Sequence, residues 1–303
     1  MRLRFSRIDA WLLLMTLIWG SNFAIVKTAM REIPEYGFGA LRLLLAAALF
    51  IAVLHRTGGV RAAASRVSTR DWRVLFVLGL IGHAVYQVLF LGGVARTSVA
   101  NSSLIFGCTP IVVTLFSAVA GHERITPLRW TGVLLSFLGI YLVVWQGQRQ
   151  GASLAGDLLI AGAVLTWAAF TIASRPLLNR HSPLVVTGFT MVVGAFGYLP
   201  LGIPSLARLD WVRVSAWAWI GMVYSAVFAL VVAYLIWYTA VQRLGNSRTS
   251  LYSNVVPLVA MGVAALTLGE PLTVRKLLGA AAVLTGLALT RVELRPANPP
   301  AEA

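Results

Sequence analysis

The feature that most constrains this chain is a sequence repeat whose two copies both lie in apolar sequence. In one register, residues of the first copy return 147 positions later: Arg96, Pro110, Glu123, Thr126, Gly132 and Gly139 become Arg243, Pro257, Glu270, Thr273, Gly279 and Gly286. The front of each copy follows a register of 148, in which Asp9, Trp19 and Lys27 become Asp157, Trp167 and Arg175. Internal duplication of a membrane-spanning unit is typical of secondary transporters.

Composition places the chain in a membrane. Of its 303 residues, 58% are hydrophobic and 12% are charged, whereas soluble domains carry about 25% charged residues. The net charge is +15, but the basic residues lie in short segments between apolar runs, where they meet lipid head groups and set orientation. We therefore expect membrane lipid, and no nucleic acid, as a partner. Cys108 is the one cysteine, so neither an internal disulfide nor a cysteine metal cluster can form, and no metal or cofactor is expected.

A spanning helix needs about 20 mostly apolar residues. The candidate runs cover residues 10–26, 37–54, 72–94, 98–120, 128–145, 158–174, 184–203, 216–241, 249–268 and 274–290. These runs are continuously apolar, which argues against a strand barrel. The first run is read as a retained helix, because it is long for a signal peptide and its counterpart after Asp157 is internal. The expected fold is an all-α integral membrane protein of ten transmembrane helices.

The basic residues predict the orientation. With the N-terminus in the cytoplasm, the inner segments hold sixteen Lys and Arg residues and the outer segments hold eight, which favours both termini inside a plasma or inner membrane. Each repeat has five helices, so the second repeat enters the membrane inverted. We expect a first repeat over 1–146, a linker over 147–156, a second repeat over 157–291 and a disordered tail over 292–303.

Several short motifs occur in order along the chain. The first helix carries Trp-Gly-Ser-Asn-Phe at 19–23 followed by Lys27, and Arg42 lies in Ala-Leu-Arg-Leu at 40–43. Later motifs are Ala-Asn-Ser-Ser at 100–103, Gly-His-Glu-Arg at 121–124 and Gly-Glu-Pro at 269–271. Together they resemble the EamA-type transporters of the drug/metabolite transporter superfamily. The resemblance implies ten helices, cytoplasmic termini, a central cavity and transport of amino acids or other small metabolites. The second repeat departs from the pattern, with Ala-Ala-Phe after Trp167 and Thr190 opposite Arg42.

Acidic residues are absent from the middle of every predicted span. A carboxylate in the membrane is the usual proton or sodium relay, so a small multidrug-pump mechanism is disfavoured. His83 is the one mid-membrane group that titrates near neutral pH. It is either a cavity contact or proton carrier, or a neutral hydrogen bond between helices.

Three basic residues near helix ends have competing interpretations. Arg42 lies about five residues inside the second helix, where it could pair, snorkel outward or bind a substrate carboxylate. Lys27 and Arg175 end the first and sixth helices, where they either anchor at head groups or line the mouth of the cavity.

The remaining cavity candidates are aromatic or neutral polar. Trp19 and Trp167 recur about ten residues into their helices, deeper than belt tryptophans, and are predicted to line the cavity or to pack helices together. The other candidates, which could bind an amino acid or serve as packing contacts, are Asn22, Tyr86, Gln87, Asn101, Tyr224, Tyr234, Trp237 and Asn254.

Proline and glycine suggest further features. Pro110 and Pro257 break the backbone ladder of two helices and are predicted kinks, either beside the transport path or purely structural. The pairs Gly132 with Gly139 and Gly279 with Gly286 are seven residues apart, so each pair shares a helix face. Close helix packing or a homodimer contact explains them.

These features favour a transporter, most simply an amino-acid exporter working by alternating access on a small-molecule solute. A carrier of sugars, nucleotides or phosphorylated metabolites is the alternative, although it should have more basic cavity residues. An intramembrane enzyme is remote: His122-Glu123 begins a zinc-protease motif, but Thr126 replaces its second histidine. A scaffold or lipid-handling protein has no positive feature beyond hydrophobicity.

Overall fold

The computed structural model describes residues 7–109, 111–112, 115–116, 127–149, 153–244, 249 and 252–290, which form helices joined by turns, with no strand among them. The helices of the first repeat are α1 Arg7–Ala29, α2 Glu35–Arg56, α3 Val60–Ser65, α4 Thr69–Gly79, η1 Leu80–Val85, α5 Tyr86–Arg96, α6 Val99–Gly107 and α8 Pro127–Arg149. Those of the second are α9 Leu154–Leu178, α10 Pro183–Ala207, α11 Ala216–Tyr224, η2 Ser225–Val232, α12 Ala233–Leu244, η3 Ser253–Val255, α14 Val256–Leu268 and α15 Val274–Thr290.

Six continuous helices are long and apolar enough to cross a membrane. They are Arg7–Ala29, Glu35–Arg56, Thr69–Arg96, Leu154–Leu178, Pro183–Ala207 and Ala216–Leu244. Each contains one of the expected runs, and shorter apolar helices lie over Trp130–Leu142 and Ser253–Leu268. The sequence expectation of a helical membrane protein is therefore confirmed. Pro110, Glu123 and the expected tail lie outside the described residues.

Two spans contain a π-helical stretch that hydrophobicity did not predict. The span that begins at Thr69 passes through η1, and the span that begins at Ala216 passes through η2. Adding 147 to Leu80–Val85 gives 227–232, which lies within η2. Both repeats therefore carry a π-helical stretch at corresponding positions of the same helix, and π turns inside α-helices are frequent at functional sites.

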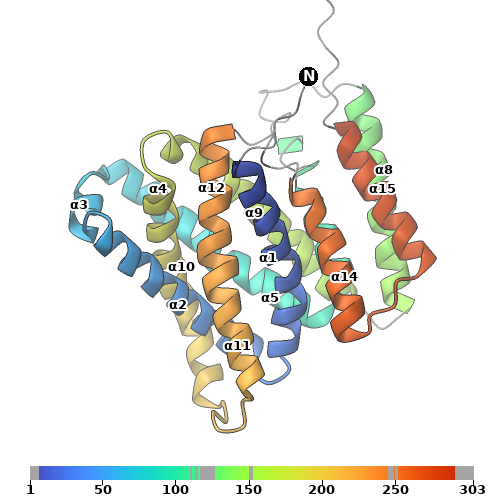
Figure 1. Ribbon diagram of the computed structural model, residues 1–303, viewed down its shortest axis with the longest axis horizontal. Helices are drawn as coiled ribbons and strands as arrows, with labels where there is room; N and C mark the ends of the chain where they lie inside the picture. The colour runs from blue at the N-terminus through green and yellow to red at the C-terminus, as the bar shows by residue number, and fades with distance from the viewer. Residues whose placement is uncertain are drawn as a thin grey trace, which may run out of the picture.

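The helices pack in pairs that join the repeats. Extensive contacts connect α2 with α10, α5 with α9, α1 with α14, and α8 with α15. Figure 1 shows α8 and α15 as a pair at one side of the bundle, with the start of α1 and the end of α15 at the same edge. Many large apolar side chains face outward, such as Leu134 at 64% exposure, as expected for a surface in contact with lipid.

The repeated glycines lie between α8 and α15. A Cβ atom added at Gly139 would be 2.6 Å from the carbonyl oxygen of Gly279, and Gly286 lies against Gly132 in the same way. The hydroxyl of Ser136 donates to the carbonyl of Val283 at 3.3 Å across the same interface. The glycines therefore serve close packing of helices within one chain, the first of the two roles expected for them.

Replacing Gly139 with alanine is expected to destabilise the protein by about 1–3 kcal/mol, because the new methyl group would displace backbone of α15. Gly262→Ala is the matched control, since a Cβ there meets nothing within 4 Å and alanine is the better helix former. The midpoint of thermal unfolding in detergent measures both. Equal midpoints for the two variants would show that the interface tolerates the methyl group.

Candidate functional site

The centre of the bundle is a cluster of aromatic rings from both repeats. The rings of Trp19 in α1 and Trp167 in α9 meet edge to face with centroids 5.9 Å apart. Tyr234 in α12 lies 6.1 Å from Trp19 and 5.3 Å from Trp167. The ring of Trp237, one turn later, lies 5.4 Å from Trp19. The two corresponding tryptophans therefore meet at one place, where they present aromatic faces and edges.

Further rings extend this aromatic cluster. Tyr86 at the start of α5 lies 5.6 Å from Trp167 and stacks on Phe90 at 5.5 Å. Sequence inspection did not single out four other members, which are Phe90, Phe106, Phe170 and Tyr238. In a continuously apolar helix, phenylalanine on the inner face cannot be distinguished from phenylalanine facing lipid.

His83 joins η1 to α10 at the edge of the cluster. Its Nε2 lies 3.1 Å from the hydroxyl of Thr190, which donates to the carbonyl of Val186 at 2.8 Å. The hydroxyl therefore accepts from Nε2, and Nδ1 is left as an acceptor. Nδ1 is buried and has no hydrogen-bond partner among the described residues. The ring lies 5.7 Å from that of Tyr234.

Arg42 in α2 is buried in the bundle with 2% of its surface exposed. Its guanidinium carbon lies 5.8 Å from the ring centre of Phe38, and the hydroxyls of Tyr86, Tyr198 and Tyr234 are within electrostatic range. Among the described residues, no group bonds its Nε or Nη1 atoms. This burial corrects the interpretation that Arg42 snorkels to the head groups, and the described residues provide no ion pair for it.

Other buried polar atoms on the helices that form the cluster also lack hydrogen-bond partners within the described ranges. Both side-chain polar atoms of Gln87 and the indole Nε1 of Trp237 are among them. Unsatisfied polar groups are costly in a membrane interior. The cluster therefore combines aromatic surface, one guanidinium and several free donors and acceptors, which can bind a small amphipathic solute.

Three polar groups of α1 are directed at the π-helical stretch of the second repeat. The indole Nε1 of Trp19 donates to the carbonyl of Ala229 at 3.0 Å, and the hydroxyl of Ser225 donates to Oδ1 of Asn22 at 2.7 Å. The hydroxyls of Ser21 and Tyr224 lie 2.9 Å apart. Asn22 and Tyr224 therefore connect α1 to the α11–η2 region.

The remaining candidates lie away from the cluster. Asn101 bonds both carboxylate oxygens of Asp157, at 3.1 and 3.2 Å, and Lys27 donates to the carbonyls of Val94 and Thr97. Both residues stabilise the turn between α5 and α6. Asn254 lies in η3, at the end of the bundle where Tyr252 bonds Asp9 at 2.7 Å.

Arg175 and Pro257 also lie outside the cluster. Arg175 is exposed near the end of α9. Pro257 stands in the first turn of α14, directly after the 3₁₀ stretch of η3. It marks a change of helix type at a position where its missing N–H costs little, and it packs against Gly107 of α6.

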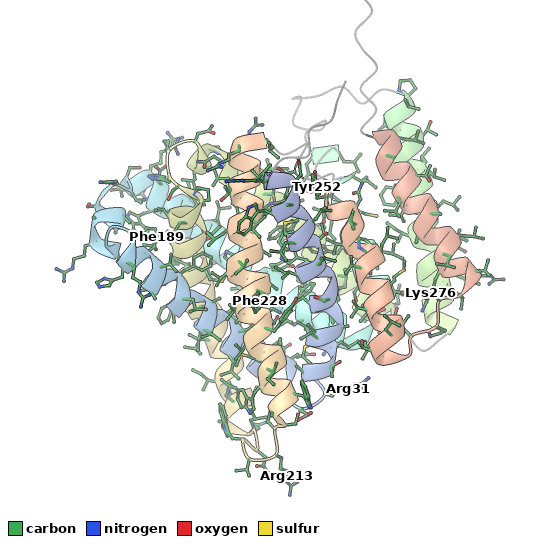
Figure 2. All side chains as sticks on the ribbon, in the orientation of Figure 1. Arg31, Phe189, Arg213, Phe228, Tyr252 and Lys276 are labelled. Atoms are coloured by element: carbon green, nitrogen blue, oxygen red, sulfur yellow. The ribbon has the colours of Figure 1, made fainter. Side chains whose placement is uncertain are left out.

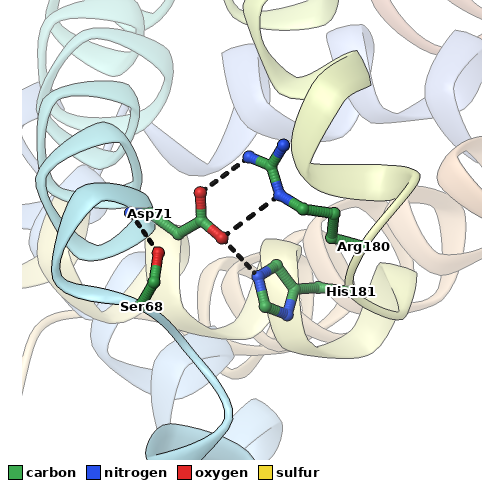
Figure 3. A network of polar contacts seen from close by, with 4 residues as sticks. All are labelled: Ser68, Asp71, Arg180 and His181. Atoms are coloured by element: carbon green, nitrogen blue, oxygen red, sulfur yellow. Dashed lines mark hydrogen bonds and ion pairs between the residues drawn. The ribbon is translucent and has the colours of Figure 1, made fainter.

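One polar network joins the repeats at the start of α4 (Figure 3). Asp71 accepts from Arg180 Nη2 at 2.7 Å and Nε at 3.3 Å, and lies 2.9 Å from His181 Nε2. Ser68 caps the helix by accepting from the backbone N–H of Asp71. Arg180 and His181 lie in the turn between α9 and α10, so the network connects two segments about 109 residues apart.

A corresponding contact lies at the other end of the bundle. Glu32, in the turn after α1, accepts from the backbone N–H of Ser215 at 2.6 Å and from its hydroxyl at 2.8 Å. The registers of 148 and 147 relate Glu32 to Arg180 and Ser68 to Ser215. In Figure 2, Arg31 and Arg213 beside this contact lie at the opposite end from Tyr252.

The pKa of Glu32 is lowered, first by the hydrogen bond from the Ser215 N–H and then by that from its hydroxyl. A lowered folded-state pKa means that the contact stabilises the protein at pH values above the ordinary carboxyl range. The stabilisation is lost as pH falls through the lowered value. The contact is therefore intact at neutral pH.

The fold and the cluster define a multi-pass membrane transporter built from two similar helical units. The EamA-like transporter family matches residues 6–145 and again residues 154–292. The chain belongs to the EamA-like transporter family, as its motifs suggested. This is a family of transporters, which agrees with the expectation that the protein is not an enzyme and acts on a small-molecule solute.

Relatives match over nearly the whole chain. The uncharacterized transporter YyaM of Bacillus subtilis (strain 168) is 27% identical, covering 90% of this chain and 89% of its own. A probable terminal-alkyne amino-acid exporter of Streptantibioticus cattleyicolor is 28% identical, with 92% of both chains covered. A probable amino-acid metabolite efflux pump of Escherichia coli (strain K12) is 26% identical, with 96% and 97% covered. One crystal structure, 22% identical, shares the fold with a TM-score of 0.67 over 94% of this chain and 96% of that chain.

Proposed function

We propose that this protein exports small polar metabolites, foremost amino acids, by alternating access through the aromatic cluster. The observation that carries the proposal is the meeting of Trp19 and Trp167 at 5.9 Å. Each repeat supplies one of these corresponding residues. Arg42, His83 and Gln87 add buried polar atoms that have no hydrogen-bond partner among the described residues. A site shared between two repeats is where a carrier that rocks one half against the other holds its solute.

We also propose ten helices arranged as two inverted repeats, and contacts at the helix ends support the inversion. Lys27 at the end of α1 bonds the carbonyl of Thr97, while Asp157 near the start of α9 accepts from the hydroxyl of Thr97 at 2.6 Å. The end of one helix therefore meets the start of its counterpart, as inversion requires. We further propose the two units 1–146 and 157–291, with both termini in the cytoplasm and the protein in the plasma or inner membrane.

The two end contacts provide the alternation. Between them runs α10, whose 25 residues span about 37 Å at 1.5 Å per residue. Asp71 with Arg180 and His181 closes one end, and Glu32 with Ser215 closes the other. Breaking one contact at a time opens the cluster to one side of the membrane and then to the other.

Amino acids are favoured over phosphorylated solutes for two reasons. Two relatives are described as amino-acid exporters or efflux pumps. Lys27 is bonded to backbone carbonyls and Arg175 is exposed, so Arg42 is left as the guanidinium beside the cluster. A phosphate ester would need more cations than this.

Counterflow in proteoliposomes tests the function. Vesicles loaded with unlabelled amino acids are expected to accumulate labelled leucine, phenylalanine or methionine above the level of protein-free vesicles, because exchange through one site needs no external energy source. Labelled glucose 6-phosphate serves as the solute of the alternative class. Accumulation of the phosphate ester without any of the amino acids would replace the proposed solute class by the alternative.

A further inference from the structure

We propose that Arg42 forms a carboxylate subsite, so that the transported solute must carry a free carboxylate while its ammonium group is dispensable. This inference rests on the proposed function and names the chemical group that the site selects. It starts from the burial of a cation with Nε and Nη1 unbonded among the described residues. A charged guanidinium in a membrane interior needs an opposite charge.

The described carboxylates are committed elsewhere. Each of the seven has another partner: Asp9 with Tyr252, Glu32 with Ser215, Glu35 with Arg96, Asp71 with Arg180, Asp157 with Asn101, Asp210 with Arg213, and Glu270 with the backbone N–H of Val99. The anion that neutralises Arg42 is therefore expected to come from outside the described protein.

The repeat explains why Arg42 lacks a partner within the described part of the chain. In the register of 148 its counterpart is Thr190, which bonds His83 of η1 at 3.1 Å. The same geometry in the other half places α2 against η2, where the residue 147 positions after His83 is Leu230. One half therefore completes its interhelical hydrogen bond, whereas the other half presents a guanidinium opposite an apolar residue.

Charge and hydrogen bonding around Tyr234 define the two ends of the solute. Arg42 is within electrostatic range of the Tyr234 hydroxyl, and the His83 ring lies 5.7 Å from the Tyr234 ring. Nδ1 of His83, which has no partner among the described residues, can accept one hydrogen bond, and either an ammonium or a hydroxyl group can donate it. The carboxylate thus meets a charge, whereas the amino group meets a neutral acceptor and aromatic faces.

Paired probes test this subsite. Binding of leucine, leucinamide, 2-hydroxyisocaproate and 2-hydroxyisocaproamide to the purified protein is followed by tryptophan fluorescence and by competition in leucine counterflow. In wild type each amide should bind at least about tenfold more weakly than its acid, because it loses a charged hydrogen bond. The hydroxy acid should compete better than leucinamide. In Arg42→Gln the difference between acid and amide should disappear, whereas Arg42→Lys should retain part of it.

Three results overturn the inference. One is an amide that binds wild type as well as its acid, which decides the question even if Arg42→Gln fails to fold. The second is a full difference between acid and amide in a folded Arg42→Gln protein. The third comes from a chloride titration in methanesulfonate buffer. If chloride saturates the site while acids and amides bind alike, Arg42 holds a free inorganic anion and not the carboxylate of the solute. If leucine is not exchanged but 2-hydroxyisocaproate is preferred over its amide, the amino-acid function fails and the carboxylate subsite stands.

Discussion

Replacing Trp167 with leucine is expected to lower the initial rate of amino-acid counterflow by at least about tenfold. Trp167 is 3% exposed and contacts Trp19, Tyr86 and Tyr234 with ring centroids 5.3–5.9 Å apart. Leucine removes the aromatic face and the edge contacts, which contribute about 0.5–1.5 kcal/mol for each pair. Trp167→Phe keeps a face in the cluster and is expected to retain an intermediate rate.

The matched control is Trp130→Leu. Trp130 lies on α8 with 48% of its surface exposed, and its loss should leave the rate within about twofold of wild type, as for a surface substitution. Thermal unfolding and size-exclusion profiles of all three variants separate lost transport from lost folding. If a folded Trp167→Leu protein transports as fast as Trp130→Leu, the aromatic cluster is not part of the transport path.

Asp71→Asn and Glu32→Gln are expected to shift the protein toward opposite open states. The first substitution removes the negative charge that holds Arg180 and His181, and the second removes the carboxylate that binds Ser215. Because Arg180 is 53% exposed, the loss at the first contact is about 1 kcal/mol, or roughly fivefold in population. If the ends alternate, opening one favours closure of the other.

Hydrogen exchange measures both ends in one experiment. Asp71→Asn should raise amide exchange in the turn 179–182 and lower it in the turn 30–33, and Glu32→Gln should do the reverse. Asp210→Asn is the control, since its ion pair with Arg213 is exposed at 57% and 87%. Faster exchange at the mutated end, with no slowing at the other end, would show local loosening instead of alternation.

The repeat and the membrane class could be predicted because both are properties of residue order and composition. The helix Val274–Thr290 was predicted to the residue, and six predicted runs lie in helices long enough to cross a membrane, since about 20 apolar residues have few alternatives to a spanning helix. Trp19 and Trp167 were identified because they recur at matching positions. Their meeting in one cluster follows from the same symmetry.

The hydrogen-bond and ion-pair partners of individual polar residues could not be predicted. Asn101 was expected beside the solute, but Asp157 binds it at the corner of α5 and α6. Arg180 and His181 lie between two predicted spans and were not singled out, although they bond Asp71 from about 109 residues away. Such contacts depend on how helices far apart in sequence are rotated, and a helix that is apolar on every face does not encode its rotation.

By itself, the sequence determined a duplicated, helical membrane protein with aromatic and basic residues at related positions of its two halves. Only the tertiary structure decided that η1 and η2 are π-helical, that Thr190 has His83 as its partner, and that Nε and Nη1 of Arg42 have none among the described residues. The physical reason is that composition fixes which solvent a segment prefers. Pairing of polar groups depends on distances of a few ångströms between helices, which no local pattern specifies.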